Sequence, residues 1–188
     1  MSTPQPTTTT ATSSRGIPKA VFLEDVQAFV GGPDGDAEAA LKALQDTLAK
    51  YRFMEQSALQ RRVGLEEKVP ELERTVEMVE VLIKKKEQGE AFSTTFELAD
   101  TLYAHGEAEN VDEVYIWLGA STMLSYPLSQ AHDLLQSKLA GARRGLASVK
   151  DDLGWLKEQI TVTEVNVARV YNYDVARRRE RREAGSAE

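Results

Sequence analysis

The chain has 188 residues, a formal net charge of −7 and no cysteine. This length fits one domain. The acidic balance argues against a nucleic-acid-binding surface on the chain as a whole, and without cysteine neither disulfides nor thiol chemistry can contribute. No apolar run approaches the ~20 residues that span a bilayer, so no membrane segment is expected.

The first residues, 1–15, are polar and repetitive, with a run of threonines. Such a stretch buries too little apolar area to offset the entropy of ordering, so we expect a disordered tail. It lacks the apolar run of a secretory signal. The stretch is rich in Ser and Thr, as transit peptides are, but Arg15 is its single basic residue. The cytosol is therefore the expected compartment, and a transit peptide is the alternative.

A short amphipathic segment is predicted at 16–36, where Phe22, Val26 and Phe29 stand at helical spacing. Clustered Gly and Pro residues then break the pattern. Asp36 is placed to cap the helix that follows, because its side chain can accept a hydrogen bond from the first free backbone N–H groups.

Two long helical patterns, at 37–88 and 128–178, each carry a coiled-coil seam. Apolar positions recur at alternating steps of three and four residues over about six heptads, which is typical of helices packed along one stripe. The first seam contains Leu41, Leu44, Leu48, Tyr51, Glu55, Ala58, Arg62, Leu65, Val69, Leu72, Val76, Val79 and Ile83. The second contains Leu128, His132, Leu135, Leu139, Ala142, Leu146, Val149, Leu153, Leu156, Ile160, Thr163, Val167, Val170 and Asp174.

The two helical patterns have nearly equal lengths, so the simplest pairing folds the second helix back along the first. In this register Leu41 faces Val170 and Ile83 faces Leu128. Pro70 lies inside the first pattern, where it removes a backbone donor and clashes with the preceding turn. We therefore predict a bend or soft spot there, with a tolerated kink of no functional consequence as the alternative.

The segment between the helices, 92–126, alternates apolar and polar residues and is rich in aromatic and β-branched side chains. This pattern predicts two β-hairpins, with breaks at 106–110 and near Gly119. One helical hairpin cannot cover the edges and apolar face of these strands, so other chains are expected to do so. The predicted fold class is α+β: a long antiparallel coiled-coil hairpin with two β-hairpins between its helices.

The end of the second helix is apolar beyond its seam. The off-seam residues are Val162, Val165, Ala168, Tyr171, Tyr173 and Val175. The amphipathic segment adds apolar side chains at the same end, so either the two cover each other or they present a surface to another protein. Residues 179–188 are too charged to pack and are expected to be a second disordered tail.

No catalytic or metal site is expected. Neighbouring acidic residues such as Asp151 and Asp152 point about 100° apart on a helix, so they do not converge on one substrate, and a solvated helix face explains them. His105 is expected in a turn and His132 in the seam, without the spacing of a metal site. The chain also lacks a phosphate-binding loop.

Five runs resemble α-class subunits of the prefoldin family: 16–29, 50–56, 95–104, 114–126 and 163–175. The predicted layout, two helical arms of equal length with a double hairpin between them, also resembles that of α-class subunits. Subunits of the β class have a single hairpin. The resemblance extends from about residue 16 to about residue 178.

This resemblance implies a heterohexamer with another α-class and four β-class subunits, in which the hairpins join a multi-subunit β-barrel. It implies ATP-independent capture of unfolded actin and tubulin at the coiled-coil tips and delivery to the cytosolic group II chaperonin, with no cofactor. The α-class type it resembles also binds the von Hippel-Lindau protein. A structural coiled-coil tether without chaperone activity is the alternative. The basic run at 177–182 is expected to solvate the end of the chain and to place favourable charge at a helix C-terminus. Nucleic-acid binding or nuclear import, and contact with an acidic patch of the chaperonin, are the alternatives.

The resemblance also suggests where partners bind. The residues expected to contact clients at the tips are Phe22, Phe29, Val165, Tyr171 and Tyr173. The residues expected at subunit interfaces are Phe96, Leu98, Leu102, Val114, Ile116, Trp117 and Leu118.

Overall fold

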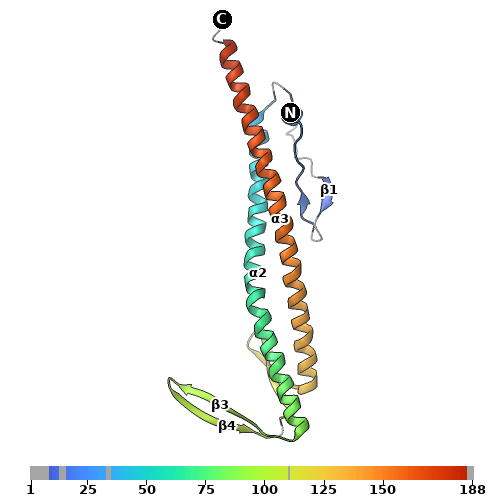
Figure 1. Ribbon diagram of the computed structural model, residues 1–188, viewed down its shortest axis with the longest axis vertical. Coiled ribbons are helices and arrows are strands. Elements are labelled where there is room, and N and C mark those ends of the chain that lie inside the picture. The colour runs from blue at the N-terminus through green and yellow to red at the C-terminus, as the bar shows by residue number, and fades with distance from the viewer. Residues whose placement is uncertain (1–8, 13–15, 33–34, 110, 186–188) are drawn as a thin grey trace. The chain divides into compact units, whose positions relative to one another are not determined.

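The computed structural model describes residues 9–12, 16–32, 35–109 and 111–185. Two long helices, α2 (Ala37–Gln88) and α3 (Leu128–Gly185), account for most of the described chain (Figure 1). The contacts form two compact units. The terminal unit contains the described residues up to Arg62 and from Ser148 onward, and the hairpin unit is Val63–Ala147.

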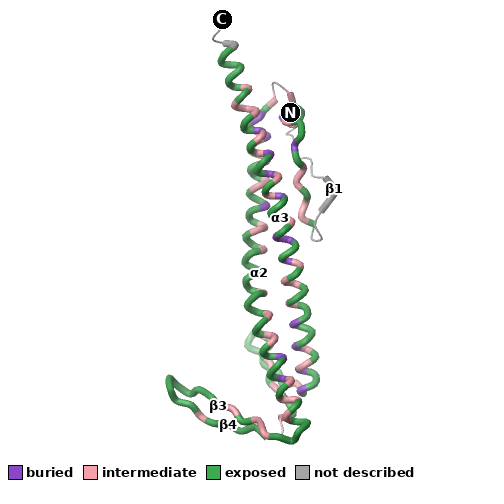
Figure 2. The backbone as a smooth tube through the Cα atoms, in the orientation of Figure 1, coloured by how far each residue is buried: buried purple, intermediate pink, exposed green. Residues whose placement is uncertain are grey.

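The coiled-coil seam predicted on α2 and α3 faces inward along both helices. Every predicted seam residue is buried or half-buried, and Figure 2 shows the intervening positions largely exposed. In the terminal unit Leu41 packs against the cluster that contains Val170. In the hairpin unit Ile83 packs against the cluster that contains Leu128. The predicted antiparallel register is therefore confirmed in each unit.

Helix α2 begins and ends with side-chain and backbone caps that its sequence supplies. Asp36 accepts hydrogen bonds from the backbone N–H groups of Glu38 and Ala39, both at 3.0 Å, as predicted. At the other end Gly89 has a positive φ of 67°, and its N–H donates to the Lys86 carbonyl. This is the left-handed glycine that commonly ends a helix. Pro70 lies inside α2, which continues on both sides of it; the predicted bend stays a prediction.

Helix α3 continues to Gly185, so the boundary predicted at residue 178 is wrong. Asp174 accepts hydrogen bonds from Arg177, at 3.0 Å, and from Arg178, at 2.7 Å, one turn further along the helix. Such pairs, together with the high helix propensity of Arg, Glu and Ala, extend a helix without tertiary packing. Residues 186–188 of the predicted tail lie outside the described residues.

The N-terminal region contains more regular structure than predicted. Strand β1 (Thr9–Thr12) pairs antiparallel with β2 (Pro18–Lys19), so the predicted disordered tail is wrong at Thr9–Thr12. Threonine is β-branched and favours strands when a partner edge is present. Residues 1–8 and 13–15 lie outside the described residues. The amphipathic segment is helical only at α1 (Val26–Val30), which Asp25 caps and Gly31 ends.

Two antiparallel hairpins follow α2. Strand β3 (Phe92–Ala99) pairs with β4 (Leu102–Ala108), and β5 (Glu113–Gly119) pairs with β6 (Thr122–Pro127). Each pair is a separate two-stranded sheet. Ala99 pairs with Leu102 and Gly119 with Thr122, so both turns are two-residue loops. Ala120 and Ser121 have φ values of 47° and 56°, which are signs of the primed turns that suit the twist of a hairpin.

The break predicted at 106–110 comes later in the structure, because Gly106 belongs to β4 and pairs with Thr94. The ring of Phe96 lies over this glycine. A Cβ atom at Gly106 would stand only 2.5 Å from Phe96 Cε2, so a side chain there would displace the ring. Gly106 thus serves ring packing on the hairpin surface, a role that polarity alone does not reveal.

Candidate assembly and binding surfaces

The first hairpin leaves apolar side chains exposed on both faces. Phe96, Leu98, Leu102 and Tyr103 are each more than half exposed, and Figure 2 shows β3 and β4 mainly as exposed. Phe96 pairs with Ala104 whereas Tyr103 pairs with Glu97, so the two rings belong to pairs on opposite faces of the hairpin. Neither face is covered by the described part of this chain.

The second hairpin has one covered face and one exposed face. Val114 and Ile116 are half-buried and pack against the core of the hairpin unit. Tyr115 and Trp117 alternate with them and are 71% and 61% exposed. Met123 pairs with Trp117 and is also exposed. The hairpin therefore presents an aromatic face away from its own helices.

The predicted interface residues fall into two groups. Phe96, Leu98, Leu102, Trp117 and Leu118 are exposed, whereas Val114 and Ile116 pack inside their own unit. Parity reasoning named Val114 and Ile116 as barrel or interface residues and did not name Tyr115, Tyr103 and Met123, which the structure shows to be exposed. The missing signal was the identity of the covered face, which depends on how the hairpin meets the helices.

The edges of the hairpins are unpaired within the described chain. Each hairpin sheet has only two strands, so every strand has one edge whose N–H and C=O groups have no ladder partner among the described residues. Two-stranded sheets are marginal alone, and contiguous exposed apolar side chains mark interaction surfaces. We call β3–β6 with their exposed apolar residues the hairpin surface.

The terminal unit has a core that covers part of the predicted client surface. Leu23 and Val30 from the N-terminal region are buried in a cluster with Val170, and Phe29 and Tyr173 pack against that cluster. These contacts place Phe29 and Tyr173 within a core, with their exposed area reduced.

The other three predicted client residues remain exposed. Val165 is 41% exposed and Tyr171 is 57% exposed. Phe22 is 45% exposed, with the guanidinium of Arg169 4.9 Å from its ring centroid. At this end some of the predicted residues therefore cover each other and others stay exposed, and the binding of another protein to the exposed ones stays a prediction.

Phe53 is an exposed aromatic residue that sequence reasoning missed. It is 74% exposed on α2 and lines a shallow hollow with Ala49, Lys50 and Met54. It lies two residues after the seam residue Tyr51, off the apolar stripe. An aromatic residue outside the stripe is the signal that could have identified it.

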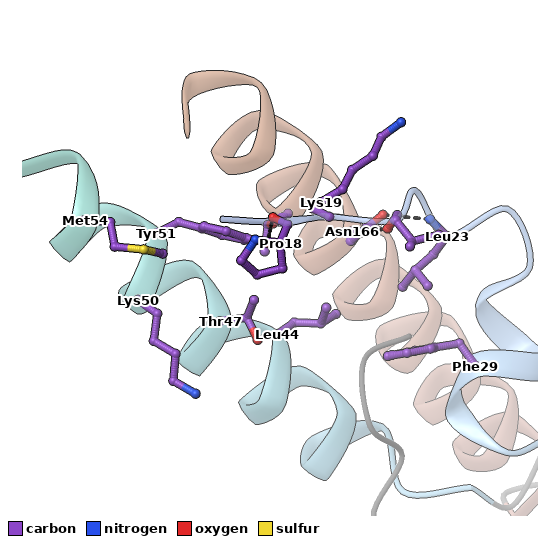
Figure 3. A pocket seen from close by; sticks show the side chains of 13 residues that line it. Pro18, Lys19, Leu23, Phe29, Leu44, Thr47, Lys50, Tyr51, Met54 and Asn166 are labelled. Atoms are coloured by element: carbon purple, nitrogen blue, oxygen red, sulfur yellow. Dashed lines mark hydrogen bonds between the residues drawn. The ribbon is translucent and has the colours of Figure 1, made fainter. Parts of the chain in front are cut away.

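Residues 17–24, which we call the N-terminal strap, are bound to α2 and α3 through the backbone of the strap. The Ala20 N–H donates to Gln159 Oε1 at 2.9 Å. Asn166 accepts from the Leu23 N–H at 2.9 Å and donates to the Val21 carbonyl at 2.7 Å. Figure 3 shows Asn166 directed at the strap beside Leu23.

Two more side chains bind carbonyls of the N-terminal strap. Tyr51 Oη donates to the Pro18 carbonyl at 3.0 Å, and Arg169 donates to the Glu24 carbonyl at 3.0 Å. Tyr51 is almost fully buried, and this burial raises the pKa of its phenol above the ordinary value of 10.0 because the phenolate would lose solvation. Tyr51 therefore remains a hydrogen-bond donor at neutral pH.

A row of buried polar side chains on α3 was not anticipated. Asp152, Gln159 and Asn166 are each at most 4% exposed. The prediction that Asp152 belongs to a solvated face is therefore wrong, whereas Asp151 is exposed. Each of the three residues precedes a seam residue by one position, so the row flanks the seam on the side that the strap covers.

A cavity of about 250 Å³ lies between the strap and the helices. Its lining is mainly apolar and includes Pro18 and Ala20 of the strap with Leu44, Tyr51 and Met54 of α2 (Figure 3). The strap therefore closes the groove between the helices without filling it.

The histidines do not come together. His105 lies in β4, not in the predicted turn, and its ring contacts Thr95 Oγ1 at 3.3 Å. His132 is half-buried and lies 3.3 Å from Glu80 Oε1. Within the described ranges no group of three His, Cys, Asp or Glu residues could hold a metal ion. No helix of the described chain is long and apolar enough to cross a membrane.

An antiparallel coiled-coil hairpin bearing two incomplete β-hairpins defines a subunit whose strands need other chains. The sequence model of the family described as "Prefoldin subunit" matches residues 51–173. Prefoldin subunit 3 of Elsinoe fawcettii is 45% identical over 180 residues, which cover 96% of this chain and 91% of that protein. The chain therefore belongs to the prefoldin family.

A second relative in sequence agrees with this assignment. Prefoldin subunit 3 of Homo sapiens is 43% identical over 164 residues, 87% of this chain and 83% of the human protein. A filamentous prefoldin from Methanocaldococcus jannaschii, solved by cryo-EM, has a TM-score of 0.41 at 14% identity, over 56% of this chain and 91% of that chain. Family membership supports a role as a chaperone subunit in a prefoldin complex, with other prefoldin subunits as partners.

Proposed function

We propose that this chain is an α-class subunit of a heterohexameric prefoldin, together with another α-class and four β-class subunits. In this assembly its hairpins join a multi-subunit β-barrel, and its terminal unit contacts unfolded actin or tubulin chains without using ATP. Clients pass from it to the cytosolic group II chaperonin. We place the complex in the cytosol, with the nucleus as a second location.

The observation that carries the assembly proposal is the hairpin surface. Both hairpins are separate two-stranded sheets with free edges, and both expose large apolar side chains, including Phe96 and Trp117. Neighbouring strands from other subunits would satisfy the edge groups and cover these side chains at once. A simple coiled-coil tether has no use for such a surface, which disfavours that alternative.

The client proposal is supported by exposed apolar residues in the terminal unit. Phe22, Phe53, Val165 and Tyr171 each present apolar area to solvent there. Several subunits that each bind one apolar stretch of a client weakly would together hold it firmly, because the later contacts form at a high effective concentration. Weak single contacts also allow release to a chaperonin.

Suppression of actin aggregation by the reconstituted complex tests the client proposal. The double substitution of Phe53→Ser and Tyr171→Ser should leave assembly intact and reduce suppression, because both side chains are largely exposed and contribute little to the fold. Glu67→Ser and Asn172→Ser, at exposed polar positions, are the matched controls. Full suppression by the assembled Phe53→Ser/Tyr171→Ser complex would count against these residues as client contacts.

Two further partners follow from the family resemblance and need separate tests. We propose the von Hippel-Lindau protein as one of them. The basic run at 177–182 is proposed to contact an acidic patch of the chaperonin. It lies in the last part of α3, where Arg178 pairs with Asp174 and the following arginines are exposed.

A further inference from the structure

We propose that the groove under the N-terminal strap is a binding site for an extended polypeptide segment of an unfolded client, and that the strap occupies this site in cis as a competitor. The inference rests on the proposed chaperone function and specifies how one of its sites recognises a client. It commits to an extended, unstructured chain as the occupant, because an extended segment is already bound there.

The hydrogen bonds between the helices and the strap go to backbone groups of the strap. Five hydrogen bonds join Tyr51, Gln159, Asn166 and Arg169 to N–H and C=O groups of residues 18–24. Every peptide carries these groups at every non-proline residue. A groove that binds them can therefore accept many sequences, which suits a protein that binds unfolded chains.

The spacing of polar side chains on α3 matches the spacing of backbone groups on the strap. Gln159 and Asn166 are seven residues apart, which corresponds to about 10.5 Å along a helix. Their backbone donors, Ala20 and Leu23, are three residues apart, which corresponds to about 10 Å along an extended chain. Side chains that recur every seven residues along α3 therefore lie opposite every third residue of an extended peptide.

The same spacing extends the site by one more position. Asp152 lies seven residues before Gln159, and Ile17 lies three residues before Ala20. Asp152 and Ile17 both line a second cavity, distinct from the one beside Pro18 and Ala20, as this register requires. The buried row of Asp152, Gln159 and Asn166 can therefore lie opposite three successive positions of an extended chain. Polar side chains are unusual inside a coiled coil, and binding of a peptide backbone explains them here.

The strap fills the groove incompletely. The cavity beside it, about 250 Å³, has a mainly apolar lining that includes Leu44, Tyr51 and Met54. The strap contributes Leu23 at one end of this lining, but its side chains at Pro18 and Ala20 are small and leave the space beside them open. A client segment with larger apolar residues at these positions would keep the backbone contacts and fill the cavity as well.

The first part of the strap, residues 17–22, can leave the groove while Leu23 stays in the core of the terminal unit. Its release frees Tyr51, Gln159 and the Asn166 amide nitrogen, which bind Pro18, Ala20 and Val21. Leu23 and Val30 anchor the following residues in the buried cluster, whereas residues 17–22 include no fully buried side chain. Gly16, with a φ of 78°, precedes the strap and allows a change of direction there. Exchange therefore requires the release of a short peptide and not the unfolding of a helix.

The test uses the assembled complex and a fluorescein-labelled peptide that is rich in Leu and Tyr and has no stable structure. Ala20→Pro removes the N–H that Gln159 accepts and leaves the groove intact. It is expected to strengthen binding about fivefold, the equivalent of one hydrogen bond. Adding Asn166→Ala to Ala20→Pro should abolish this gain, because the groove then loses a group that binds the peptide backbone. Asn172→Ala, an exposed asparagine on the same helix, is the control.

A second probe tests backbone recognition directly. The same peptide with alternate backbone nitrogens methylated keeps its side chains and should bind at least about fivefold more weakly. If the strap were only a cover over an apolar surface, both variants would bind more tightly than wild type and methylation would have no effect. That pattern would overturn this inference and leave the proposed function standing. If neither the wild-type complex nor any variant bound the probe, the chaperone proposal itself would fail.

Discussion

Asn166→Ala is expected to loosen the N-terminal strap more than any other single truncation on α3. The Asn166 side chain is 2% exposed and makes two hydrogen bonds, to the Leu23 N–H and the Val21 carbonyl. Alanine would leave both groups without that partner. Because Leu23 is buried, water cannot fully replace the lost acceptor. A buried donor without a partner costs about 1–3 kcal/mol, and loss of the part-buried bond to the Val21 carbonyl adds about 1 kcal/mol, so the pair together should cost about 2–4 kcal/mol.

Hydrogen exchange followed by mass spectrometry measures this cost in the assembled complex. The Ala20 amide reports strap opening, since its acceptor is Gln159 and is unchanged by the substitution. If the free energy of strap opening falls by about 2–4 kcal/mol, the Ala20 amide should exchange between about 30-fold and about 10³-fold faster than in wild type. Asn172→Ala removes the same side chain from an exposed position and should change nothing. Exchange in Asn166→Ala within about twofold of the control would refute the reasoning.

Two other substitutions probe separate parts of the structure. Trp117→Ser should weaken hexamer formation, measured by size-exclusion chromatography, and leave the helicity of the isolated chain unchanged, because the ring is 61% exposed. Glu107→Ser, at an exposed polar position, is its control. Unaltered assembly of Trp117→Ser would argue against the hairpin surface as an interface. Tyr51→Phe should remove an alkaline loss of stability. Burial raises the pKa of Tyr51 above 10.0, so its contribution is complete below about pH 10 and disappears as pH rises through the folded value. Thermal unfolding at a series of pH values measures this stability. If both proteins lost the same stability at alkaline pH, the role given to Tyr51 would be contradicted.

The sequence predicted the helices well because a coiled coil is a local, repetitive pattern. Each seam residue from Leu41 to Ile83 could be assigned from its spacing alone, and the register followed from the equal lengths of two patterns. The Asp36 cap was predictable for the same reason, because its partners are two and three residues away.

What sequence reasoning missed depends on a third segment meeting the two helices. Asp152, Gln159 and Asn166 look like ordinary polar positions until the strap is placed over them, and neither the extended form of the strap nor its partners can be read from its own apolar spacing. The hairpins were predictable, but the face that Val114 turns toward its own helices, and Tyr115 away from them, depends on packing. The helical end of α3 shows that a highly charged segment can still be regular.

The most direct measurement of the central claim is the mass and composition of the complex that contains this chain. Tagged purification followed by native mass spectrometry should give a hexamer with one further α-class and four β-class prefoldin subunits. In the proposed assembly these partners cover the edges of the hairpin surface. A homodimer, or a single unrelated partner in equal amount, would contradict the account, because the exposed strands would then belong to a different assembly.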